Sequence, residues 1–549
     1  MRSATLLAAA LAATSAFAAP APATADSDVI IGRGLKAAKR GAVATEAAPC
    51  SEIGAKVLED GGNAVDAIIS SALCVGTIAA YHSGIGGGGF GIVRYKDKAT
   101  KSWKYETIDY REFMPAAGNE TMYAADTDGA KLSTVGGLAA GVPGELRGWE
   151  AMWKRHGSYP WKKLFEPAVN VARNGFTVNV DLAGGIVQGQ SFILSDPLWA
   201  EVYAPNGTLL VEGDTCYRKR YADTLEKIGE HGADWFYHGE NAVTTTAALY
   251  ARGGIMTPAD MAAYEAVVRE TVNITYRDSR IFSTVAPSSG SVVLSALKIF
   301  ENFDGSAGSH DPAFNLTQHR LIEATQFAYG QRTQLGDPAF TPNVTYLEQL
   351  YLEPEITTAL AAKISDNTTH GLSYYDPSNY TATAESGTSH MAVIDGEQMA
   401  VSLTTTVNTY WGSQVMTAAG VIMNNEMDDF SSPGQTNSFG FAASPVNYIA
   451  GHKRPQSSIS SSIAEDLDTG DILIATGSAG GSRIITTTIQ YLYHHLDQGL
   501  NAHQCVHYSR WHDQLSGELY LEYRDMVSQP LTIGSASRHG LLADLAPDS

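Results

Sequence analysis

Residues 385–413, which read ESGTSHMAVIDGEQMAVSLTTTVNTYWGS, constrain the fold more than any other part of the chain. Two runs in this stretch, SHMAVID and MAVSLTTTV, have the length and the side-chain pattern of β-strands. The second run ends in hydroxyl side chains where a central strand would carry Val or Ile. Alternation along a strand places Thr404, Thr406 and Asn408 on one face. A strand with polar side chains on one face either meets water or lines a site.

Helical and strand-like runs are mixed along the rest of the chain. Residues 51–80 have helical apolar spacing, and Ser51 is the predicted N-cap. YETIDYREFMP predicts a strand that ends at Pro115, and GVPGELRGWEAMWKRHG predicts a turn followed by an amphipathic helix. After residue 386, SSISSSIAED and DILIATG read as further strands and SRIITTTIQYLYHHLDQ reads as a helix. The predicted fold class is therefore α+β, and 549 residues suit several domains or one large intertwined unit.

The acidic balance and the N-terminal segment limit partners and location. The formal net charge is -21, so nucleic acid and anionic lipid are not expected partners. The start, MRSATLLAAALAATSAFAAP, predicts a secretory signal peptide over residues 1–19, with cleavage near Ala18 or Ala19. Its apolar run is too short to cross a bilayer, and no other apolar stretch of about 18 residues occurs. We expect a product without a membrane span, either extracellular or in the lumen of the secretory pathway.

Asn-X-Ser/Thr sequons agree with a secreted product, since they are the acceptors of N-glycosylation. All of them precede residue 388. They are Asn119, Asn206, Asn273, Asn315, Asn343, Asn367 and Asn379.

An even number of cysteines in an oxidising compartment permits two disulfides. Cys50 and Cys74 are the closest pair in the sequence and form the favoured bridge, with four buried thiols as the alternative. The pairing of Cys216 and Cys505 is left open. A zinc site is not expected, because the sequence contains no Cys-x-x-Cys.

Two strings resemble ligand-binding motifs but favour simpler interpretations. GIGGGG, residues 84–89, matches the dinucleotide fingerprint in letters, yet a helix precedes it and a strand follows, the reverse of the required order. A tight turn with close backbone approach is favoured. His503 and His507 have helical i, i+4 spacing, but no Glu lies between them in a metalloprotease pattern. A hydrogen-bonded helix surface is favoured there, and no metal site is predicted.

The Gly387-Thr388 pair has one reading that involves chemistry. A threonine hydroxyl is a poor nucleophile and needs a base. If the chain is cut before Thr388, the freed α-amine lies beside its own Oγ and titrates near neutrality. Gly387 leaves its carbonyl open to attack by Thr388 Oγ, which permits self-cleavage through an N-to-O acyl shift. From this dipeptide alone, a capping threonine in a turn is the favoured interpretation.

Later strings add the groups that such a nucleophile needs. In NNEMDDFSSPG, Glu426 and Asp429 are carboxylates at i, i+3 that could hold an ammonium group. KRPQSSIS offers the adjacent hydroxyls of Ser457 and Ser458. GSAGGSR offers the backbone N–H groups of residues 480–481 for an oxyanion pocket. Each string taken alone is more often a turn or a cap.

Taken together, these strings resemble the gamma-glutamyltransferase family of the N-terminal-nucleophile hydrolase superfamily. The resemblance runs from about residue 30 to about residue 515. It implies a four-layer αββα sandwich and self-cleavage between Gly387 and Thr388. A large subunit, residues 20–387, and a small subunit, residues 388–549, would then stay associated as a heterodimer. The motifs that carry it, in family order, are SGIGGGGF, IDYRE, GVPGELRG, SGTSH, TTTVN, NNEMDDFSSPG, KRPQSSIS and GSAGGSRIITT.

The resemblance also implies the reaction and the groups that perform it. Thr388 matches the nucleophile, and Thr406 matches the threonine that hydrogen-bonds the nucleophile's amine. Gly480 and Gly481 match the oxyanion glycines. The γ-glutamyl group of glutathione or another γ-glutamyl compound would form an acyl-enzyme and pass to water or to the amine of an amino acid or dipeptide. No metal or organic cofactor is implied.

The donor-binding residues are implied in the same way. Arg111 matches the arginine that pairs with the donor's α-carboxylate, a bidentate task that suits a guanidinium and not an ammonium. Two serines match the hydroxyls that complete this carboxylate site, and three further residues match the group that holds the α-ammonium. The serines are Ser457 and Ser458, and the ammonium-binding residues are Asn408, Glu426 and Asp429.

One segment departs from the family pattern, and another leaves open which of two aromatic residues is the gate. After about residue 515 the chain ends in LTIGSASRHGLLADLAPDS, where the family continues through further strand and helix to a Gly-rich end. The loop from Ser431 to Pro455 matches a lid, and it carries Phe439 and Phe441 where many members have an aromatic gate.

Two alternative functions are considered. One is a cephalosporin-acylase-like amidase of the same superfamily, and the other is an unprocessed, non-catalytic binding glycoprotein. The presence of Arg111 together with Glu426 and Asp429 argues against the amidase, because an α-amino-acid zwitterion requires both of its charges to be matched.

Overall fold

A computed structural model gives the structure of the chain. It describes residues 41–123, 131–309, 311–376, 387–434, 443–522 and 536–537. All of these residues belong to one compact unit, Lys36–Ser549. The predicted signal peptide, Asn379, Phe439 and Phe441 lie outside the described residues.

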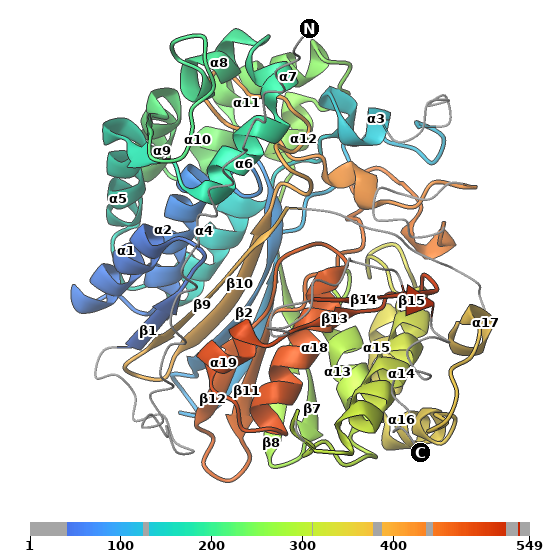
Figure 1. The fold of residues 1–549 in the computed structure, drawn as a ribbon. Coiled ribbons are helices and arrows are strands. Elements are labelled where there is room, and N and C mark those ends of the chain that lie inside the picture. Colours follow the sequence, from blue (N-terminus) through green and yellow to red (C-terminus); the bar gives the residue numbers. More distant parts are fainter. Residues whose placement is uncertain are drawn as a thin grey trace, which may run out of the picture. The chain divides into compact units, whose positions relative to one another are not determined.

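An antiparallel six-stranded sheet holds both strands predicted from residues 385–413 (Figure 1). SHMAVID forms β9 and pairs with β10 in the middle of the sheet, and the glycine-rich β2 pairs with the other edge of β10. In spatial order the strands are β1 (Gly41–Ala44), β9 (Ser389–Asp395), β10 (Ala400–Thr406), β2 (Gly88–Lys96), β3 (Trp103–Asp109) and β6 (Val267–Glu270).

A second antiparallel sheet packs against the first. Its strands, in spatial order, are β12 (Ile472–Thr476), β11 (Ser462–Asp466), β8 (Ser279–Ser283) and β7 (Val272–Tyr276). Ile92 and Ala400 of the first sheet form one buried cluster with Ile463 and Ile472 of the second. The rings of Tyr105 and Phe282 also stack between the sheets, with centroids 3.5 Å apart. The strands predicted from SSISSSIAED and DILIATG are thereby confirmed.

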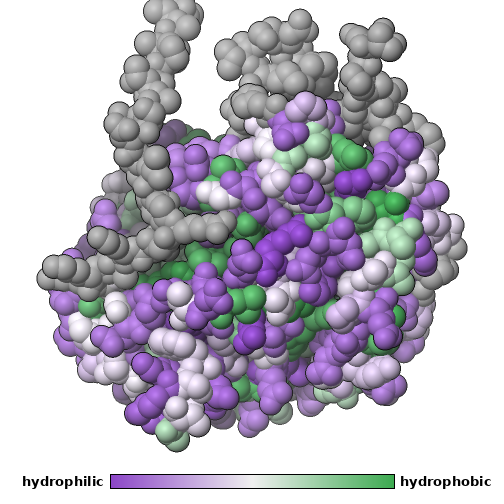
Figure 2. Space-filling view, turned by 90° about the horizontal axis from the view of Figure 1, so that it is seen from below, coloured by the Kyte–Doolittle hydropathy of each residue, from purple (hydrophilic) through white to green (hydrophobic). Residues whose placement is uncertain are grey.

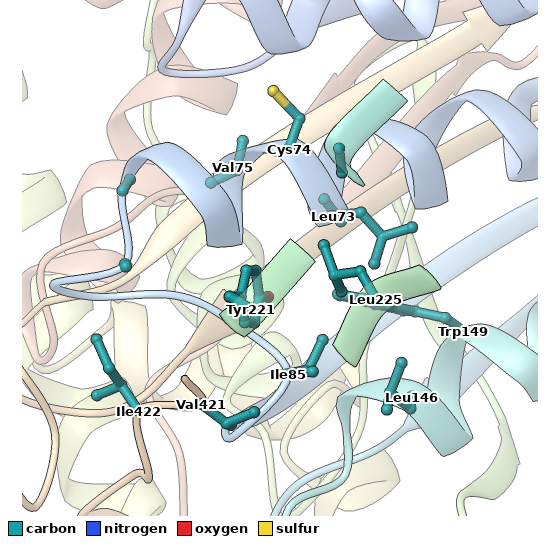
Figure 3. Packing of buried hydrophobic residues seen from close by; sticks show 14 of the residues in the cluster. Leu73, Cys74, Val75, Ile85, Leu146, Trp149, Tyr221, Leu225, Val421 and Ile422 are labelled. Atoms are coloured by element: carbon teal, nitrogen blue, oxygen red, sulfur yellow. The ribbon is translucent and has the colours of Figure 1, made fainter. Parts of the chain in front are cut away.

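Each sheet has its own group of helices (Figure 1). The six-stranded sheet shares a core with α1 (Ala48–Glu59), α2 (Ala64–Ile78), α4 (Glu145–His156), α5 (Trp161–Asn174) and α9 (Lys219–His231). Figure 3 shows part of this core, where side chains from α2, α4 and α9 converge. The second sheet shares a core with α13 (Gly290–Phe300), α14 (Phe314–Arg332) and α18 (Arg483–Leu496).

The described chain has further α-helices and β-strands. They are α3 (Lys131–Thr134), β4 (Phe176–Thr177), α6 (Val180–Gln188), α7 (Gln190–Ile193), α8 (Pro197–Tyr203), β5 (Thr215–Cys216), α10 (Asp234–Tyr237), α11 (Gly239–Tyr250), α12 (Pro258–Ala262), α15 (Val344–Leu350), α16 (Pro354–Ala361), α17 (Leu372–Tyr375), α19 (Ala502–His507), β13 (Trp511–His512), β14 (Glu518–Leu521) and β15 (Ala536–Ser537).

The helical prediction for residues 51–80 is confirmed, but its N-cap is wrong. Two helices occupy this range, and Ser51 lies inside α1, which begins at Ala48 with a proline in its first turn. The Ser51 hydroxyl instead accepts a hydrogen bond from the Thr45 amide at 3.1 Å. The second helix begins with a capping box between Asn63 and Asp66, because GGN interrupts the helical run.

The favoured disulfide is present. Cys50 of α1 and Cys74 of α2 are bridged, with their Cα atoms 5.3 Å apart. Cys216 and Cys505 are free thiols, and both are buried. The pairing that the sequence left open is therefore not formed.

The glycine run lets three backbone segments meet. A Cβ on Gly87 would lie 1.9 Å from the Thr406 carbonyl oxygen, and one on Gly89 would lie 2.0 Å from that of Thr404. A Cβ on Gly86 would lie 2.0 Å from the carbonyl oxygen of Ile422. These approaches confirm the interpretation as close backbone contact. The run also follows α2 and opens β2, the order that excludes a dinucleotide fingerprint.

The strand predicted to reach Pro115 ends earlier, at Asp109 of β3. The Asp109 carboxylate accepts the Arg111 amide at 3.0 Å and pairs with the Arg269 and Arg454 side chains. These contacts turn the chain out of the sheet. The turn, which β-propensity does not encode, brings Arg111 to the site described below.

Among the described residues, no helix is long and apolar enough to cross a membrane, and no group of three His, Cys, Asp or Glu side chains could hold a metal ion. His503 and His507 lie on the surface of α19, as predicted. Figure 2 shows a face on which hydrophilic side chains predominate and hydrophobic ones form small separate groups.

Candidate active site

Gly387 and Thr388 lie where the chain enters β9, beside the end of β10. Thr388 is 7% exposed. A Cβ on Gly387 would lie 2.6 Å from His82 Cβ and 2.7 Å from Tyr410 Cδ1, so this position accepts only glycine without rearrangement. The Gly387 amide donates to the Asn408 carbonyl at 2.9 Å. The peptide bond before Thr388 is thus held in a fixed place.

Thr406 contacts this peptide bond directly. Its hydroxyl donates to the Gly387 carbonyl oxygen at 2.9 Å and accepts the Asn408 amide at 2.7 Å. The Asn408 amide therefore fixes the direction of the threonine hydroxyl, and the hydroxyl polarises the carbonyl that Thr388 would attack. Thr404, on the same face of β10, contacts His390 Nδ1 at 2.9 Å and lies further from the bond.

The prediction that Asn408 continues this strand face is wrong in its geometry. β10 ends at Thr406, and Asn408 has a φ of 76°, in the left-handed region. Asn408 returns to the site through a turn, where its amide group donates from Nδ2 to the Asn425 carbonyl at 2.9 Å. The residue is in the site, although strand alternation does not put it there.

Arg111, Glu426 and Asp429 form one buried cluster. The Arg111 guanidinium makes ion pairs with both carboxylates. It also donates to the carbonyls of Pro455 at 3.3 Å and Gln456 at 2.9 Å. A 3-10 helix, Glu426–Asp429, aligns the two acids on one side, because side chains three residues apart eclipse in that helix. The sequence placed these residues at opposite ends of a ligand, and the structure shows them in contact with each other.

Excess negative charge collects in this cluster. Burial raises the pKa of Glu426 and of its neighbour Glu112, and Arg111 opposes both shifts. Burial also raises the pKa of Asp429 to about 8, against the attraction of Arg111. One guanidinium does not stabilise all three carboxylates in their ionised form, so part of the cluster is protonated at neutral pH. Glu112 was not among the predicted site residues, although it follows Arg111 in the DYRE string.

Ser457 and Ser458 follow the carbonyl that Arg111 contacts. The Ser457 hydroxyl accepts the Ile459 amide at 3.2 Å, and the Ser458 hydroxyl accepts Arg332 Nη2 at 3.3 Å. The structure therefore places the two serines directly after the carbonyl of Gln456, which accepts a hydrogen bond from Arg111. It also adds Arg332, which the sequence analysis did not single out.

Gly480 and Gly481 lie in the loop between β12 and α18, and both have positive φ, 115° and 60°. The loop packs on His390, two residues after Thr388, since a Cβ on Gly477 would lie 2.4 Å from its Cε1. Burial lowers the pKa of His390 to about 3, so its ring is neutral. Neither glycine amide donates to another described protein group. Both remain available to an oxyanion.

These residues form one connected site. Contacts run from Gly387 through Thr406 and Asn408 to the segment that precedes Glu426. Arg111 then links Glu426 to Gln456 and so to the two serines. The site thus has the Thr388 hydroxyl at one end and a buried cluster of positive and negative side chains at the other.

A family model described as Gamma-glutamyltranspeptidase matches residues 50–533. The chain belongs to the gamma-glutamyltranspeptidase family. The family is one of enzymes, and the matched residues contain every predicted site residue described above.

Relatives of this gamma-glutamyltranspeptidase-family chain extend over most of its length. It is 44% identical over 490 residues to the glutathione hydrolase proenzyme of Arthroderma benhamiae, covering 86% of this chain and 82% of that protein. It is 36% identical over 514 residues to glutathione hydrolase proenzyme 1 of Schizosaccharomyces pombe, covering 93% and 79%. For the glutathione hydrolase proenzyme of Escherichia coli, identity is 34% over 496 residues, covering 88% and 83%.

Solved structures confirm the α+β fold. The gamma-glutamyltranspeptidase of Helicobacter pylori superposes with a TM-score of 0.56 at 31% identity, covering 61% of this chain and 94% of that one. A cephalosporin acylase from Bacillus halodurans superposes with a TM-score of 0.73 at 23% identity, covering 90% and 86%. At that identity the superposition shows a shared fold and does not indicate the substrate of this chain.

Proposed function

We propose that this transpeptidase-family enzyme cleaves its own chain between Gly387 and Thr388 and then uses Thr388 to hydrolyse glutathione or to transfer its γ-glutamyl group. The observation that carries the proposal is the connected site. At one end the Gly387 carbonyl accepts a hydrogen bond from Thr406, and at the other Arg111 contacts Glu426 and Asp429. Relatives named glutathione hydrolase support the choice of substrate.

Self-cleavage begins with attack of Thr388 Oγ on the Gly387 carbonyl carbon. The bond from that carbon to the Thr388 nitrogen breaks, and the hydroxyl proton passes to the nitrogen as it becomes an amine. Thr406 stabilises the developing oxyanion, because its hydroxyl already donates to that oxygen. Water then hydrolyses the resulting ester, which leaves a Gly387 carboxylate and a free Thr388 with its own α-amine.

The mature nucleophile repeats this chemistry on the donor. The α-amine of Thr388, which like other α-amines titrates near neutrality, accepts the hydroxyl proton. Oγ attacks the γ-carbonyl carbon, and the amides of Gly480 and Gly481 receive the oxyanion. The C–N bond of the donor breaks, and the leaving amine takes the proton. Water or an acceptor amine then attacks the ester and restores the threonine hydroxyl.

The donor's two charges replace the partners that the charged groups of the site have in the structure. Its α-carboxylate takes the Arg111 fork and the hydroxyls of Ser457 and Ser458, while its α-ammonium takes Glu426 and Asp429. In the structure these two acids are ion-paired with Arg111. Because each charge of the donor replaces an internal partner, a ligand lacking one charge leaves a buried group unpaired.

The proposal extends to the assembly and to the location of the enzyme. Residues 20–387 and 388–549 form the two subunits, which stay together because β9 and β10 are paired with β1 and β2 on both sides. The packed sheets with helices around them support a four-layer αββα sandwich. Secretion is supported by exposed sequons at Asn119, Asn206, Asn273, Asn315, Asn343 and Asn367.

Donor selectivity tests this function against the acylase alternative. We expect γ-glutamyl-anilide to be cleaved with a kcat/KM higher than that of glutaryl-anilide, which lacks only the α-amine. The loss of a buried charge pair predicts a ratio on the order of 30- to 1,000-fold, or ~2–4 kcal/mol. Equal cleavage of the two anilides, or a preference for glutaryl-anilide, would favour the amidase.

The same pair of anilides tests the protonation of Asp429. Its pKa is raised to about 8, so the carboxyl binds a proton as the pH falls below that value and loses its attraction for an ammonium group. The ratio of kcat/KM for γ-glutamyl-anilide to that for glutaryl-anilide should therefore rise with pH, by up to about tenfold per unit, and level off above about 8. Titration of the Thr388 amine affects both substrates and cancels in the ratio. A ratio that does not change between pH ~6 and ~8 would exclude this role of Asp429.

A further inference from the structure

Arg332 is a second buried arginine at the predicted carboxylate end of the site. It is the last residue of α14 and is 5% exposed. Its Nη2 donates to the Ser458 hydroxyl at 3.3 Å. Its backbone carbonyl accepts Gln456 Nε2 at 2.8 Å, and the carbonyl of Gln456 in turn accepts Arg111. Arg332 and Arg111 therefore hold the same short segment from two sides.

A second contact of Arg332 strengthens this arrangement. Its Nε donates to the Ser289 hydroxyl at 3.0 Å, and that hydroxyl donates to the Ser457 carbonyl at 2.6 Å. The backbone adds two hydrogen bonds between the same turns, from Ser457 to Pro287 at 2.8 Å and from Ser289 to Ile459 at 2.7 Å. The guanidinium of Arg332 thus bridges the 287–289 turn and the Ser457–Ser458 pair, through Nε on Ser289 and Nη2 on Ser458.

The hydrogen bonds also fix which way the serine hydroxyls can act. Ser457 Oγ accepts the Ile459 amide, and Ser458 Oγ accepts Arg332. Neither hydroxyl donates a hydrogen bond to any other described residue. A hydroxyl whose oxygen is occupied by a donor can still donate its own hydrogen. Two such hydroxyls beside Arg111 suit a ligand group that only accepts, which is the property of a carboxylate.

The charge of Arg332 reaches the site as well. Burial lowers its pKa to about 10, Tyr329 and Asp429 oppose the shift, and the positive charge of Arg111 adds to it. Arg332 therefore remains a cation at neutral pH, close enough to Arg111 and Asp429 to interact with both. Arg332 and Arg111 therefore bring two positive charges to the side of the acidic cluster that carries Ser457 and Ser458.

We propose that Arg332 is a positioning residue of the donor site, which turns the Ser458 hydroxyl hydrogen toward the donor's α-carboxylate and adds a second positive charge behind it. This inference rests on the proposed function and deepens it, since it assigns carboxylate selectivity to a residue that does not touch the reacting atoms. Because Arg332 acts through Ser458, its effect should depend on that hydroxyl and on the presence of a carboxylate in the donor.

The test uses the mature enzyme and two donors, γ-glutamyl-anilide and 4-aminobutyryl-anilide, which lacks only the α-carboxylate. Arg332→Lys keeps a positive charge but cannot contact Ser289 and Ser458 at the same time. The KM for γ-glutamyl-anilide should therefore rise about tenfold, while kcat changes less than about twofold. KM for 4-aminobutyryl-anilide should not change. In a Ser458→Ala background, Arg332→Lys should raise KM by less than about twofold, because the residue through which it acts is gone.

A role in folding alone predicts another pattern. Equal losses for the two donors, a fall in kcat with constant KM, or additive effects in the Ser458→Ala background would overturn the proposal. If Arg332→Lys does not fold, Ser289→Ala supplies the test. This variant keeps Arg332 and removes the hydroxyl that accepts a hydrogen bond from its Nε. That variant should raise KM for γ-glutamyl-anilide alone, and an unchanged KM overturns the proposal. Failure of the wild-type enzyme to cleave γ-glutamyl-anilide would instead refute the proposed function, and this inference with it.

Discussion

Replacing Thr388 with Ala should leave a single uncleaved chain and reduce turnover of γ-glutamyl-anilide by on the order of 10⁴-fold or more. The variant lacks the hydroxyl that attacks Gly387, and without cleavage no α-amine is freed to act as a base. The Thr406 hydroxyl still contacts the Gly387 carbonyl, so the fold around the bond should be retained. A denaturing gel and an anilide assay measure the two effects.

Two matched variants separate the nucleophile from its surroundings. Thr388→Ser retains an attacking hydroxyl and should still be cleaved. Ser389→Ala removes the hydroxyl of the next residue, which is also buried, and should be cleaved normally. If Thr388→Ala gave two subunits of normal size, Thr388 would not be the nucleophile.

Replacing Arg111 with Lys should lower kcat/KM for γ-glutamyl-anilide by on the order of 30- to 1,000-fold, or ~2–4 kcal/mol. A lysine offers one point charge in place of the fork that now contacts Glu426, Asp429 and two backbone carbonyls. The loss should appear mainly in KM, because the α-carboxylate is bound equally in the ground state and the transition state.

The control for this variant is a bidentate arginine outside the site. Arg320 of α14 forms an ion pair with Asp366, and both side chains are partly exposed. Arg320→Lys should change kcat/KM by less than about twofold, since exposed pairs contribute little. An Arg111→Lys enzyme with the kcat/KM of the wild type would remove Arg111 from the donor site.

The sequence predicts local features of this fold well and distant contacts poorly. SHMAVID and the glycine run are predictable because alternation and the lack of a Cβ act within a few residues. The end of β3 is not, because Asp109 turns the chain through Arg269 and Arg454, which lie 160 and 345 positions away in the sequence. The N-cap of α1 is wrong for a similar reason, since the Ser51 hydroxyl accepts the Thr45 amide instead.

The composition of the site was predicted, but its internal pairing was not. Arg111 and Glu426 are separated by 315 residues, and a family resemblance that assigns each to a ligand does not say what they contact when no ligand is present. Glu112 and Arg332 were not predicted, because burial gives Glu112 its raised pKa and a contact between distant segments joins Arg332 to Ser458, and the order of residues reveals neither. Glu112 nevertheless lies within the IDYRE string, and Arg332 contacts Ser458 of the KRPQSSIS string.

Intact-mass analysis of the purified, deglycosylated wild-type protein, with N-terminal sequencing of each fragment, tests the central claim most directly. We expect two fragments, the smaller of which begins Thr-Ser-His-Met, the sequence that starts at Thr388. A single full-length chain, or a small fragment that begins at any other residue, would contradict self-cleavage at Gly387-Thr388 and with it the role of Thr388 as an N-terminal nucleophile.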